Sequence, residues 1–545
     1  MLNSGKTFSI LRLKWQDIPY FPITSLTRGM LRRVYGIWSC VATLGVNSGN
    51  SCHSCHYLPL NFKKHWMLSL AITLSLILRV ALPFRTIFGS GAVRFADTDS
   101  YYFASGVRLL TESNPPVFPN PILYTRLLYH FTLISPFDIH IDMMIVPLAL
   151  HLATMVAVYF LTQTLWGRTP AIISTIIFSL LPGEYLVRSL LGNIDYHTAE
   201  VALTTLGMLG IMLFLEASRS WRVRIGVLIC GIACFTLYSQ IWAGYPVFIS
   251  PLAVFGVVFL LKKINRVIVT VTLIIGCSAV VLILAQRVLA FPGTTWIATA
   301  EARPIFINPL SAVPMALFIM TAIGAFVCWK DYRRTKDNKL LLLIIWSVAI
   351  MAATLLQRRF GYYLAVNTSI ILGYLVFKSA LAVSNHKAGL CAVVVTGVLC
   401  LIMLPGSIKI ASEVTNAPSD DWVEALEWVG ENTPAAANIT AWWDYGYWIK
   451  YISRRNPIAD PGQSPKDIKL VASILTTSNE DEVRAVDYLI LDVETMCRKY
   501  SAVEAWAGRK GTDSAARRLW EGGWIEGIEL IYSNDTIKVY WRKKT

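Results

Sequence analysis

Two short acidic stretches, far apart in the chain, carry side chains at a spacing that could hold a metal ion. Asp97 and Asp99 stand two residues apart, and Asp195 stands two residues before His197. Each pair by itself could hold a divalent cation, the first through two carboxylates and the second through a carboxylate and an imidazole. A solvated loop start at the first pair, and a capping Asp with an interfacial His at the second, remain open as alternatives.

Two further stretches each carry one charged residue of interest. Glu301 stands within Thr299–Pro304, where it could be an ordinary loop charge. Arg359 stands within Arg358–Tyr363, between two apolar runs. An arginine on the outer side of a membrane indicates a bound anion or a buried acceptor, with snorkelling to the interface as the alternative.

A fifth stretch, Ala441–Trp448, is rich in aromatic side chains. It places Trp442, Trp443, Asp444 and Tyr445 directly before Gly446. Indole N–H groups donate hydrogen bonds, the carboxylate accepts them, and glycine allows a close backbone approach, so this stretch could bind and enclose a small polar group. A buried aromatic cluster of a small domain is the alternative.

The composition shows what must position these stretches. Of the 545 residues 55% are hydrophobic and only 15% are charged, and the mean hydropathy is +0.51, which is too apolar for a water-soluble chain of this length. The sequence therefore predicts a polytopic α-helical membrane protein. The net charge of +15 is accounted for by cytoplasmic loops and anionic lipid headgroups. Nucleic acid is excluded as a partner because the chain has no basic-aromatic motif.

Apolar runs long enough to cross a bilayer recur from Trp66 onwards. Merging or splitting of neighbouring runs allows about 11–13 transmembrane helices. Eleven runs are legible: 66–84, 144–166, 170–187, 199–216, 223–241, 245–261, 267–287, 309–329, 340–357, 361–378 and 388–409.

The short connectors between these runs alternate in basic charge, and the positive-inside rule places the basic set in the cytoplasm together with the N-terminus. The basic connectors contain Arg168; Arg219, Arg222 and Arg224; Lys262, Lys263 and Arg266; Lys330, Arg333, Arg334, Lys336 and Lys339; and Lys378 and Lys387. The loops 85–143 and 288–308, the turns at Asp195 and Arg359, and the segment after residue 409 then face outwards. All five polar stretches are thus predicted on one side of the membrane.

Three domains are expected. Residues 1–65 form an N-terminal extension of unclear role, whose Cys52, Cys55 and His56 match a haem-attachment spacing on a segment predicted to stay in the cytoplasm. Residues 66–409 form the transmembrane domain. Residues 410–545 form a small mixed α/β extracytoplasmic domain, with helical spacing at 422–429 and a buried strand at 487–492.

The pentapeptide Trp442–Gly446 resembles the signature of the catalytic subunit of oligosaccharyltransferases, the membrane enzymes of N-glycosylation. The order of the other stretches is similar to that family: an Asp after the first span, a second motif between the third and fourth spans, and a Glu in a long outer loop. The Asp195 and His197 pair preceded by Gly192 looks like the archaeal form, so the resemblance is greatest to the archaeal single-subunit dolichyl-phosphooligosaccharide-protein glycotransferase. It runs from about Trp66 to the C-terminus.

The resemblance implies a glycosyltransferase that moves a glycan en bloc from a polyprenyl (dolichyl) phosphate or diphosphate to the Asn amide of Asn-x-Ser/Thr. The implied partners are the lipid-linked donor, the acceptor polypeptide and membrane lipid, and the enzyme would act as a single subunit. The implied location is the plasma membrane, with the active site and C-terminal domain outside the cytoplasm.

The resemblance also implies roles for individual residues. They are catalysis by Asp99 and Glu301; binding of Mn²⁺ or Mg²⁺ by Asp99, Asp195, His197 and Glu301; binding of the acceptor peptide by Trp442, Trp443, Asp444 and Arg359; and support by Tyr445, Gly446 and Lys499.

Two alternatives remain open at the level of sequence. Another polyprenyl-phosphate-sugar-dependent transferase, of the O-mannosyl or aminoarabinose type, would share the acidic motif but would not need the paired indoles. A lipid-linked glycan transporter would instead predict charges deep inside the spans and an internal repeat.

Overall fold

The computed structural model of the chain describes residues 62–89, 93–112, 123–216, 218–242, 244–261, 304–306, 312–383, 387–414, 417–462 and 464–543. The chain divides into two units, Met1–Lys64 and His65–Thr545, and every contact discussed below lies within the second. Glu301, the predicted span 267–287, and Cys52, Cys55 and His56 lie outside the described residues.

Eight helices of the described part are long and apolar enough to cross a membrane. They are α2 (Phe62–Leu76), which continues through the π-helical turn η2 (Ile77–Ala81) to α3 (Phe84–Phe88), α6 (Ile139–Trp166), α9 (His197–Phe214), α10 (Trp221–Ser239), α14 (Ala312–Thr335), α15 (Asn338–Leu356), α16 (Gly361–Val383) with the preceding 3₁₀ turn η4 (Arg358–Phe360), and α17 (Ala388–Ser412). Each matches a predicted run. The predicted runs 170–187 and 245–261 contain the shorter apolar helices α7 (Arg168–Leu180) and α11 (Pro246–Leu261). The prediction of a multi-pass helical membrane protein is confirmed.

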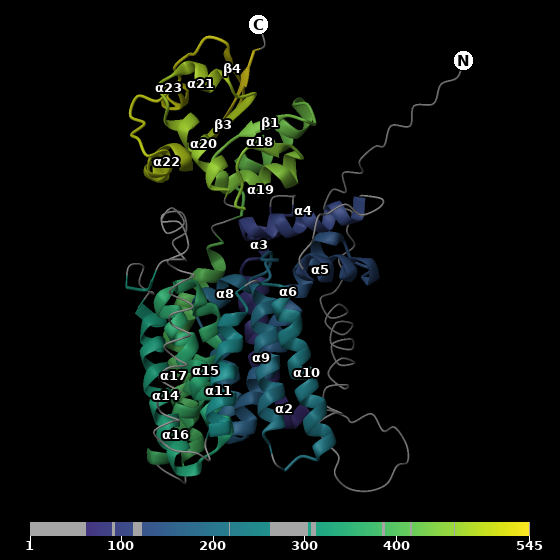
Figure 1. The fold of residues 1–545 in the computed structure, drawn as a ribbon, viewed down its shortest axis with the longest axis vertical. Coiled ribbons are helices and arrows are strands. Elements are labelled where there is room, and N and C mark those ends of the chain that lie inside the picture. Colours follow the sequence, from purple (N-terminus) through teal and green to yellow (C-terminus); the bar gives the residue numbers. More distant parts are fainter. Residues whose placement is uncertain are drawn as a thin grey trace, which may run out of the picture. The chain divides into compact units, whose positions relative to one another are not determined.

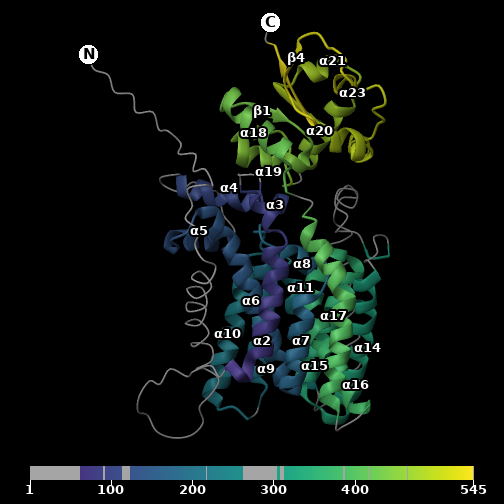
Figure 2. The same cartoon turned by 180° about the vertical axis from the view of Figure 1, so that it is seen from behind.

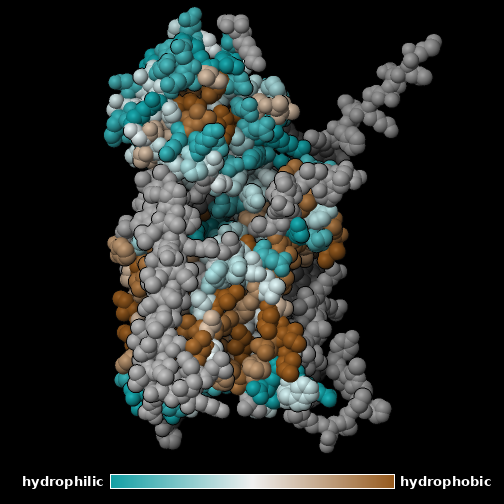
Figure 3. Space-filling model, viewed as in Figure 1, coloured by the Kyte–Doolittle hydropathy of each residue, from teal (hydrophilic) through white to brown (hydrophobic). Residues whose placement is uncertain are grey.

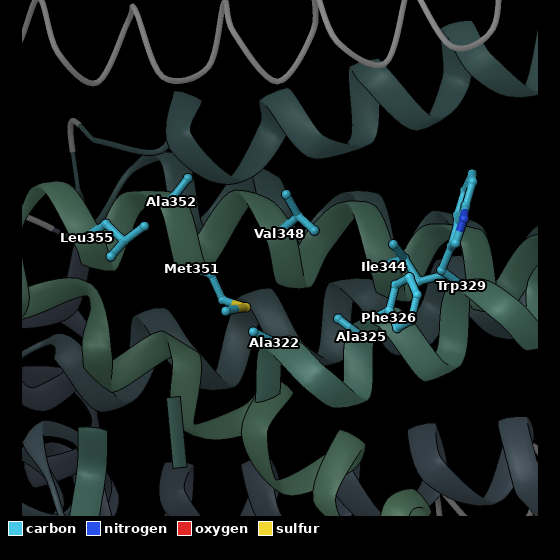
Figure 4. Close-up of a pocket in the computed structure, with 9 residues that line it drawn as sticks. All are labelled: Ala322, Ala325, Phe326, Trp329, Ile344, Val348, Met351, Ala352 and Leu355. Atoms are coloured by element: carbon cyan, nitrogen blue, oxygen red, sulfur yellow. The ribbon is translucent and has the colours of Figure 1, made fainter. Parts of the chain in front are cut away.

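The long helices present apolar side chains outwards as well as inwards. On α17, Leu390, Val393 and Leu401 are each more than half exposed, an arrangement that suits contact with lipid. Figure 3 shows hydrophobic residues gathered over the helical bundle and mostly hydrophilic ones over the C-terminal domain. A cavity of about 440 Å³ between α14 and α15 is lined only by apolar side chains, among them Phe326, Trp329 and Met351 (Figure 4), so it offers no group for catalysis.

Three short helices lie at one end of the long helices, where the connections carry the acidic stretches (Figures 1 and 2). They are α4 (Thr98–Glu112), α5 (Leu123–Ile134) and α8 (Glu184–Arg188). Helix α4 packs against α5 on one side and against the C-terminal domain on another. It therefore links the transmembrane part to the segment that carries the paired indoles.

The C-terminal domain is a five-stranded mixed sheet with helices, as predicted. Its strands are β1 (Asn438–Thr440), β2 (Asn456–Pro457), β3 (Tyr488–Asp492), β4 (Ile528–Ser533) and β5 (Ile537–Arg542), in the order β2-β1-β3-β5-β4. Its helices are α18 (Asp420–Asn432), α19 (Gly446–Trp448), α20 (Pro465–Thr476), α21 (Glu480–Arg484), α22 (Tyr500–Ala507) and α23 (Ala515–Trp520), with the shorter turns η5 (Trp443–Tyr445), η6 (Ile449–Ser453) and η7 (Glu494–Arg498).

The sheet brings the aromatic motif next to the end of a neighbouring strand. Strands β1 and β3 pair in parallel, so their carboxyl ends lie at the same edge of the sheet. The motif follows β1 directly, and Asp492 is the last residue of β3. Gly446 is required there, because a Cβ at this position would come within 2.5 Å of the Ala459 carbonyl oxygen and of the Asp460 backbone.

Candidate active site

The two acidic stretches meet in space. One carboxylate oxygen each from Asp97, Asp99 and Asp195 lies within 4.8 Å of the other two. Asp97 directly precedes α4, Asp99 lies in its first turn, and Asp195 lies in the turn between α8 and α9. Asp97 and Asp195 are buried and Asp99 is partly exposed, so the acidic cluster formed by these three residues is open on one side.

Backbone contacts hold the two segments together. The Ala96 N–H donates to the Gly192 carbonyl at 2.8 Å, and the Ile194 N–H donates to Ser100 Oγ at 2.9 Å. Gly192 has a φ of +87°, and a Cβ there would lie 2.4 Å from a methyl carbon of Ile87 and 3.1 Å from the Ala96 nitrogen. Only glycine suits both this conformation and this close approach.

Arg188 supplies the positive charge that balances the acidic cluster. Its Nη1 lies 2.5 Å from Asp97 Oδ2 and 3.5 Å from Asp195 Oδ2. Burial raises the pKa of the Asp195 carboxyl well above its usual value; the Arg188 charge opposes this rise, and the charges of Asp99 and Asp97 add to it. The sequence analysis missed Arg188, although an arginine seven residues before Asp195 at the outer end of a span was a usable signal.

His197, the first residue of α9, lies between two carboxylates. Its Nε2 is 3.1 Å from Asp195 Oδ2, and its Nδ1 is 3.2 Å from Glu200 Oε2. Glu200 is fully buried and was also missed. Its signal was a lone carboxylate near the start of an apolar span, three residues after a candidate ligand.

The donor set of the acidic cluster fits a divalent cation. Three carboxylates and the imidazole of His197 offer oxygen ligands with one nitrogen, which hard and borderline divalent metals accept. The balancing charge of Arg188 lowers the cost of gathering three acidic groups in a buried place. The predicted ligands Asp99 and Asp195 therefore lie together with Asp97, and the predicted ligand His197 contacts this cluster through Asp195.

Two indole nitrogens in the stretch Ala441–Trp448 are hydrogen-bond donors without an acceptor in the part of the chain that the structure describes. The Nε1 atoms of Trp443 and Trp448 are buried and have no hydrogen-bond partner among the described residues. A buried unpaired donor costs about 1–3 kcal/mol, so an incoming hydroxyl oxygen would satisfy it. Asp444, next to Trp443, accepts from Lys499 Nζ at 2.7 Å.

Asp492, at the end of the neighbouring strand β3, holds the aromatic motif in place by hydrogen bonds. Its Oδ1 accepts from the Tyr445 hydroxyl at 2.9 Å and from the Thr495 N–H at 3.0 Å. Burial raises the pKa of the Asp492 carboxyl, and these hydrogen bonds and the charge of Lys499 oppose the rise. Tyr445 is thus fixed by the neighbouring strand, which positions the pocket residues before it.

Arg359 lies in η4 against aromatic rings. Its guanidinium carbon is 5.9 Å from the Trp242 ring centre and 5.6 Å from that of Phe360, and its Nε has no hydrogen-bond partner among the residues described. Burial raises the pKa of Tyr196, and the charge of Arg359 opposes that rise. Arg359 therefore lies close to the turn that carries Asp195.

Helix α4 joins the acidic cluster to the aromatic motif. The rings of Tyr102 and Tyr447 lie 5.4 Å apart, and Arg108 Nη1 donates to the Tyr451 carbonyl at 2.6 Å. Burial raises the pKa of Tyr447, and the charges of Asp460 and Asp99 raise it further. Fold and site together define an integral-membrane enzyme with its polar centre at the ends of the spans, an architecture that suits a glycosyltransferase using a lipid-linked sugar.

Comparison with known proteins identifies the family. Residues 113–307 match the model described as "Oligosaccharyl transferase STT3, N-terminal", and residues 436–515 match the "STT3/PglB/AglB core domain". The chain belongs to this oligosaccharyltransferase family. The prediction of the family and of a glycosyltransferase is confirmed.

Curated relatives include archaeal glycotransferases. Dolichyl-phosphooligosaccharide-protein glycotransferase 3 of Archaeoglobus fulgidus is 22% identical, over 82% of this chain and 71% of that protein. Glycotransferase 2 of Pyrococcus horikoshii is 29% identical over 35% of this chain and 25% of its own length.

Solved structures share the fold. The oligosaccharyltransferase AglB of Archaeoglobus fulgidus, in complex with an inhibitory peptide and a dolichol-phosphate, superposes with a TM-score of 0.72 at 18% identity, covering 87% of this chain and 80% of that one. The oligosaccharyltransferase of that organism tethered to an acceptor peptide with the NVT sequon gives 0.66 at 19% identity, covering 89% and 74%. ArnT of Cupriavidus metallidurans bound to undecaprenyl phosphate gives 0.52 at 10% identity, covering 88% and 98%. The family models and the curated relatives favour the oligosaccharyltransferase prediction over the aminoarabinose alternative.

Proposed function

We propose that the chain transfers a glycan en bloc from a polyprenyl phosphate or diphosphate to the side-chain amide of Asn in Asn-x-Ser/Thr. One observation carries this proposal: helix α4 carries Asp99 of the acidic cluster and packs against α19, which directly follows the aromatic residues with the unpaired indole N–H. An acceptor bound at both places would present its amide to the carboxylates and its hydroxyl to the indole.

The amide nitrogen of Asn is a poor nucleophile because its lone pair is delocalised into the carbonyl. Asp99, together with Glu301 from the outer loop 288–308, would accept hydrogen bonds from the two amide N–H groups and twist the nitrogen out of conjugation. The partial exposure of Asp99 leaves it accessible for this role.

The proposed ligands of the cation are Asp99, Asp195, His197 and Glu301, and the position of Asp97 adds a fifth candidate. Mn²⁺ or Mg²⁺ suits this oxygen-rich set. When bound, such an ion would neutralise the negative charge of the leaving phosphate. Arg188 would oppose the repulsion among the carboxylates and hold Asp97 and Asp195 in place.

Trp442, Trp443 and Asp444 would bind the Ser or Thr hydroxyl two residues after the acceptor Asn. The unpaired Nε1 of Trp443 supports this role, because an acceptor without a hydroxyl would leave that donor unsatisfied. Tyr445, Gly446 and Lys499 would shape the pocket, and Arg359 would contact the peptide or the glycan phosphate.

We place residues 66–409 in the plasma membrane as the transmembrane domain and residues 410–545 outside it, with the N-terminal 65 residues in the cytoplasm. The charge pattern of the connectors supports this topology. The donor would be dolichyl-linked and the enzyme would work as a single subunit, in line with the archaeal relatives.

An in vitro assay tests the proposal. Purified protein is mixed with crude lipid-linked oligosaccharide and a labelled Asn-x-Thr peptide, with and without EDTA. We expect glycopeptide that EDTA abolishes and Mn²⁺ restores, and near-complete loss for Asp99→Ala and for Glu301→Ala. Full activity of both variants would refute the mechanism, and transfer to Ser or Thr hydroxyls would favour an O-mannosyl type.

A further inference from the structure

A carboxylate that the proposed function does not use lies one helical turn beyond the acidic cluster. Glu200 is on α9, three residues after His197, and it is fully buried in a span. An ionisable group at such a place is expensive and usually has a functional reason. Its contacts indicate what that reason is.

Two hydroxyl donors and the ring of His197 meet at one oxygen of Glu200. Tyr362 and Tyr363 each donate a hydroxyl to Oε2 at 2.8 Å, and His197 Nδ1 lies 3.2 Å from the same atom. The Tyr363 hydroxyl is itself held by the Tyr238 hydroxyl at 3.0 Å. These contacts, made by residues of α9, α10 and α16, hold the Glu200 carboxyl group in place as a hydrogen-bond acceptor.

Two tyrosine rings pack against the imidazole ring of His197, both tilted to its plane. Its centre lies 4.6 Å from the ring of Tyr196 and 4.7 Å from that of Tyr362. With Nδ1 at Glu200, the ring directs Nε2 towards Asp195 Oδ2, 3.1 Å away. Tyr362 thus both packs against the ring and donates a hydrogen bond to Glu200.

A neutral imidazole has one N–H and one lone pair, and the hydrogen bond at one nitrogen decides which atom can bind a metal. The Tyr362 and Tyr363 hydroxyls both donate to Oε2, so this oxygen is an acceptor, and Glu200 favours the form of His197 with hydrogen on Nδ1. The lone pair is then on Nε2, on the side of the acidic cluster. Histidine ligands of metals are commonly oriented in this way by a carboxylate.

We propose that Glu200 is a positioning residue for the candidate metal centre, fixing His197 as the Nδ1–H tautomer so that Nε2 is presented to the cation. The inference rests on the proposed function, because it requires a cation at the acidic cluster. A carboxylate at position 197 would not need this partner, since it has no tautomers. Glu200 and His197 therefore act as one unit.

A double-mutant cycle tests this unit. Mn²⁺ alone is titrated into the full-length purified chain, and free Mn²⁺ is followed by electron paramagnetic resonance. We expect Glu200→Gln to weaken Mn²⁺ binding about tenfold, His197→Ala to weaken it at least as much, and the double variant to bind no more weakly than His197→Ala. Glu216→Gln, which removes a carboxylate just beyond the other end of α9, should bind as the wild type does.

Unchanged affinity in Glu200→Gln, or additive losses in the double variant, would overturn the inference and leave the metal site intact. No Mn²⁺ binding by the wild type would instead contradict the metal in the proposed function. If Glu200→Gln does not fold, ¹⁵N-histidine NMR of the Zn²⁺-loaded wild type replaces it, with His197 assigned by its loss in His197→Ala. Hydrogen on Nδ1 supports the inference, and hydrogen on Nε2 refutes it.

Discussion

The acidic cluster and the aromatic motif are built in opposite ways. The acidic cluster takes residues from separate segments and depends on the Arg188 ion pairs and on backbone bonds between the chain around Ala96 and the turn at Gly192. The aromatic motif is one continuous stretch on a small sheet, anchored locally by the bond from Tyr445 to Asp492. The acidic cluster should therefore respond to changes of charge, and the aromatic motif to changes of packing.

The largest effect is expected where the acidic cluster loses a carboxyl group. Asp195→Asn keeps the shape of the side chain but replaces a proposed carboxylate ligand of the cation with an amide, and transfer should fall by about a thousandfold. Initial rates of glycopeptide formation measure this. Asp138→Asn is the matched control, because Asp138 lies outside the acidic cluster, where it caps α6 and contacts His140 Nδ1, and Asn caps equally well. Equal losses in both variants would contradict the special role of the acidic cluster.

The aromatic motif should respond with a change of affinity. Trp443→Ala removes the unpaired indole donor and should raise KM for an Asn-x-Thr peptide about 10- to 100-fold. KM for the lipid-linked donor should stay within about twofold, since no part of the motif belongs to the acidic cluster. Steady-state kinetics with each substrate varied in turn separates the two. An equal loss for both substrates would remove the hydroxyl-pocket role.

A contact between α4 and the C-terminal domain can be removed without changing a residue of the acidic cluster or of the aromatic motif. Arg108 donates to the carbonyls of Tyr451 and Lys450 and covers the Tyr451 ring at 4.9 Å. Arg108→Ala should lower kcat about tenfold through misalignment, with Mn²⁺ and peptide affinities unchanged. Arg126→Ala, on the exposed side of α5, is the control. A changed Mn²⁺ affinity in Arg108→Ala would contradict this prediction, because it would show that the contact also shapes the acidic cluster.

The smallest effect concerns stability and pH. Burial raises the pKa of the Asp492 carboxyl in the folded protein. The contribution of this group to the stability of the folded protein is therefore fully present below the unfolded pKa near 3.8, and it is lost as the pH rises through the folded pKa. Asp492→Asn keeps an acceptor for Tyr445 and removes this pH dependence, and at pH 7 its Tm should differ by no more than about 3 °C. Thermal unfolding from pH 4.5 to 7 checks this, and parallel curves for both proteins would contradict it.

The sequence predicted those features that depend on residues close together in the chain. Apolar run length alone located eight spans, because a bilayer imposes a fixed minimum. The five residues Trp442–Gly446 are adjacent in the chain, so their joint chemistry was legible before any fold was known. The mixed C-terminal sheet was expected from a short buried strand and an amphipathic helix.

What escaped prediction depends on contacts between distant segments. Arg188 is a single basic residue at the end of an apolar run, and its meaning appears only when the fold brings Asp97 to it. Glu200 lies inside a predicted span, and its tyrosine partners come from a helix more than 160 residues later. Spacing along the chain cannot reveal a hydrogen bond of that kind.

The buried guanidinium of Arg188 bears on how the protein is made. Small zinc modules stay unfolded until their ion arrives, because binding of the ion supplies their folding free energy. Here an internal counter-charge is already present, so insertion and folding need not wait for an ion. The protein is expected to fold without the proposed cation and to bind it afterwards at the partly exposed Asp99. The active fraction of the protein would then depend on the concentration of divalent cations around it.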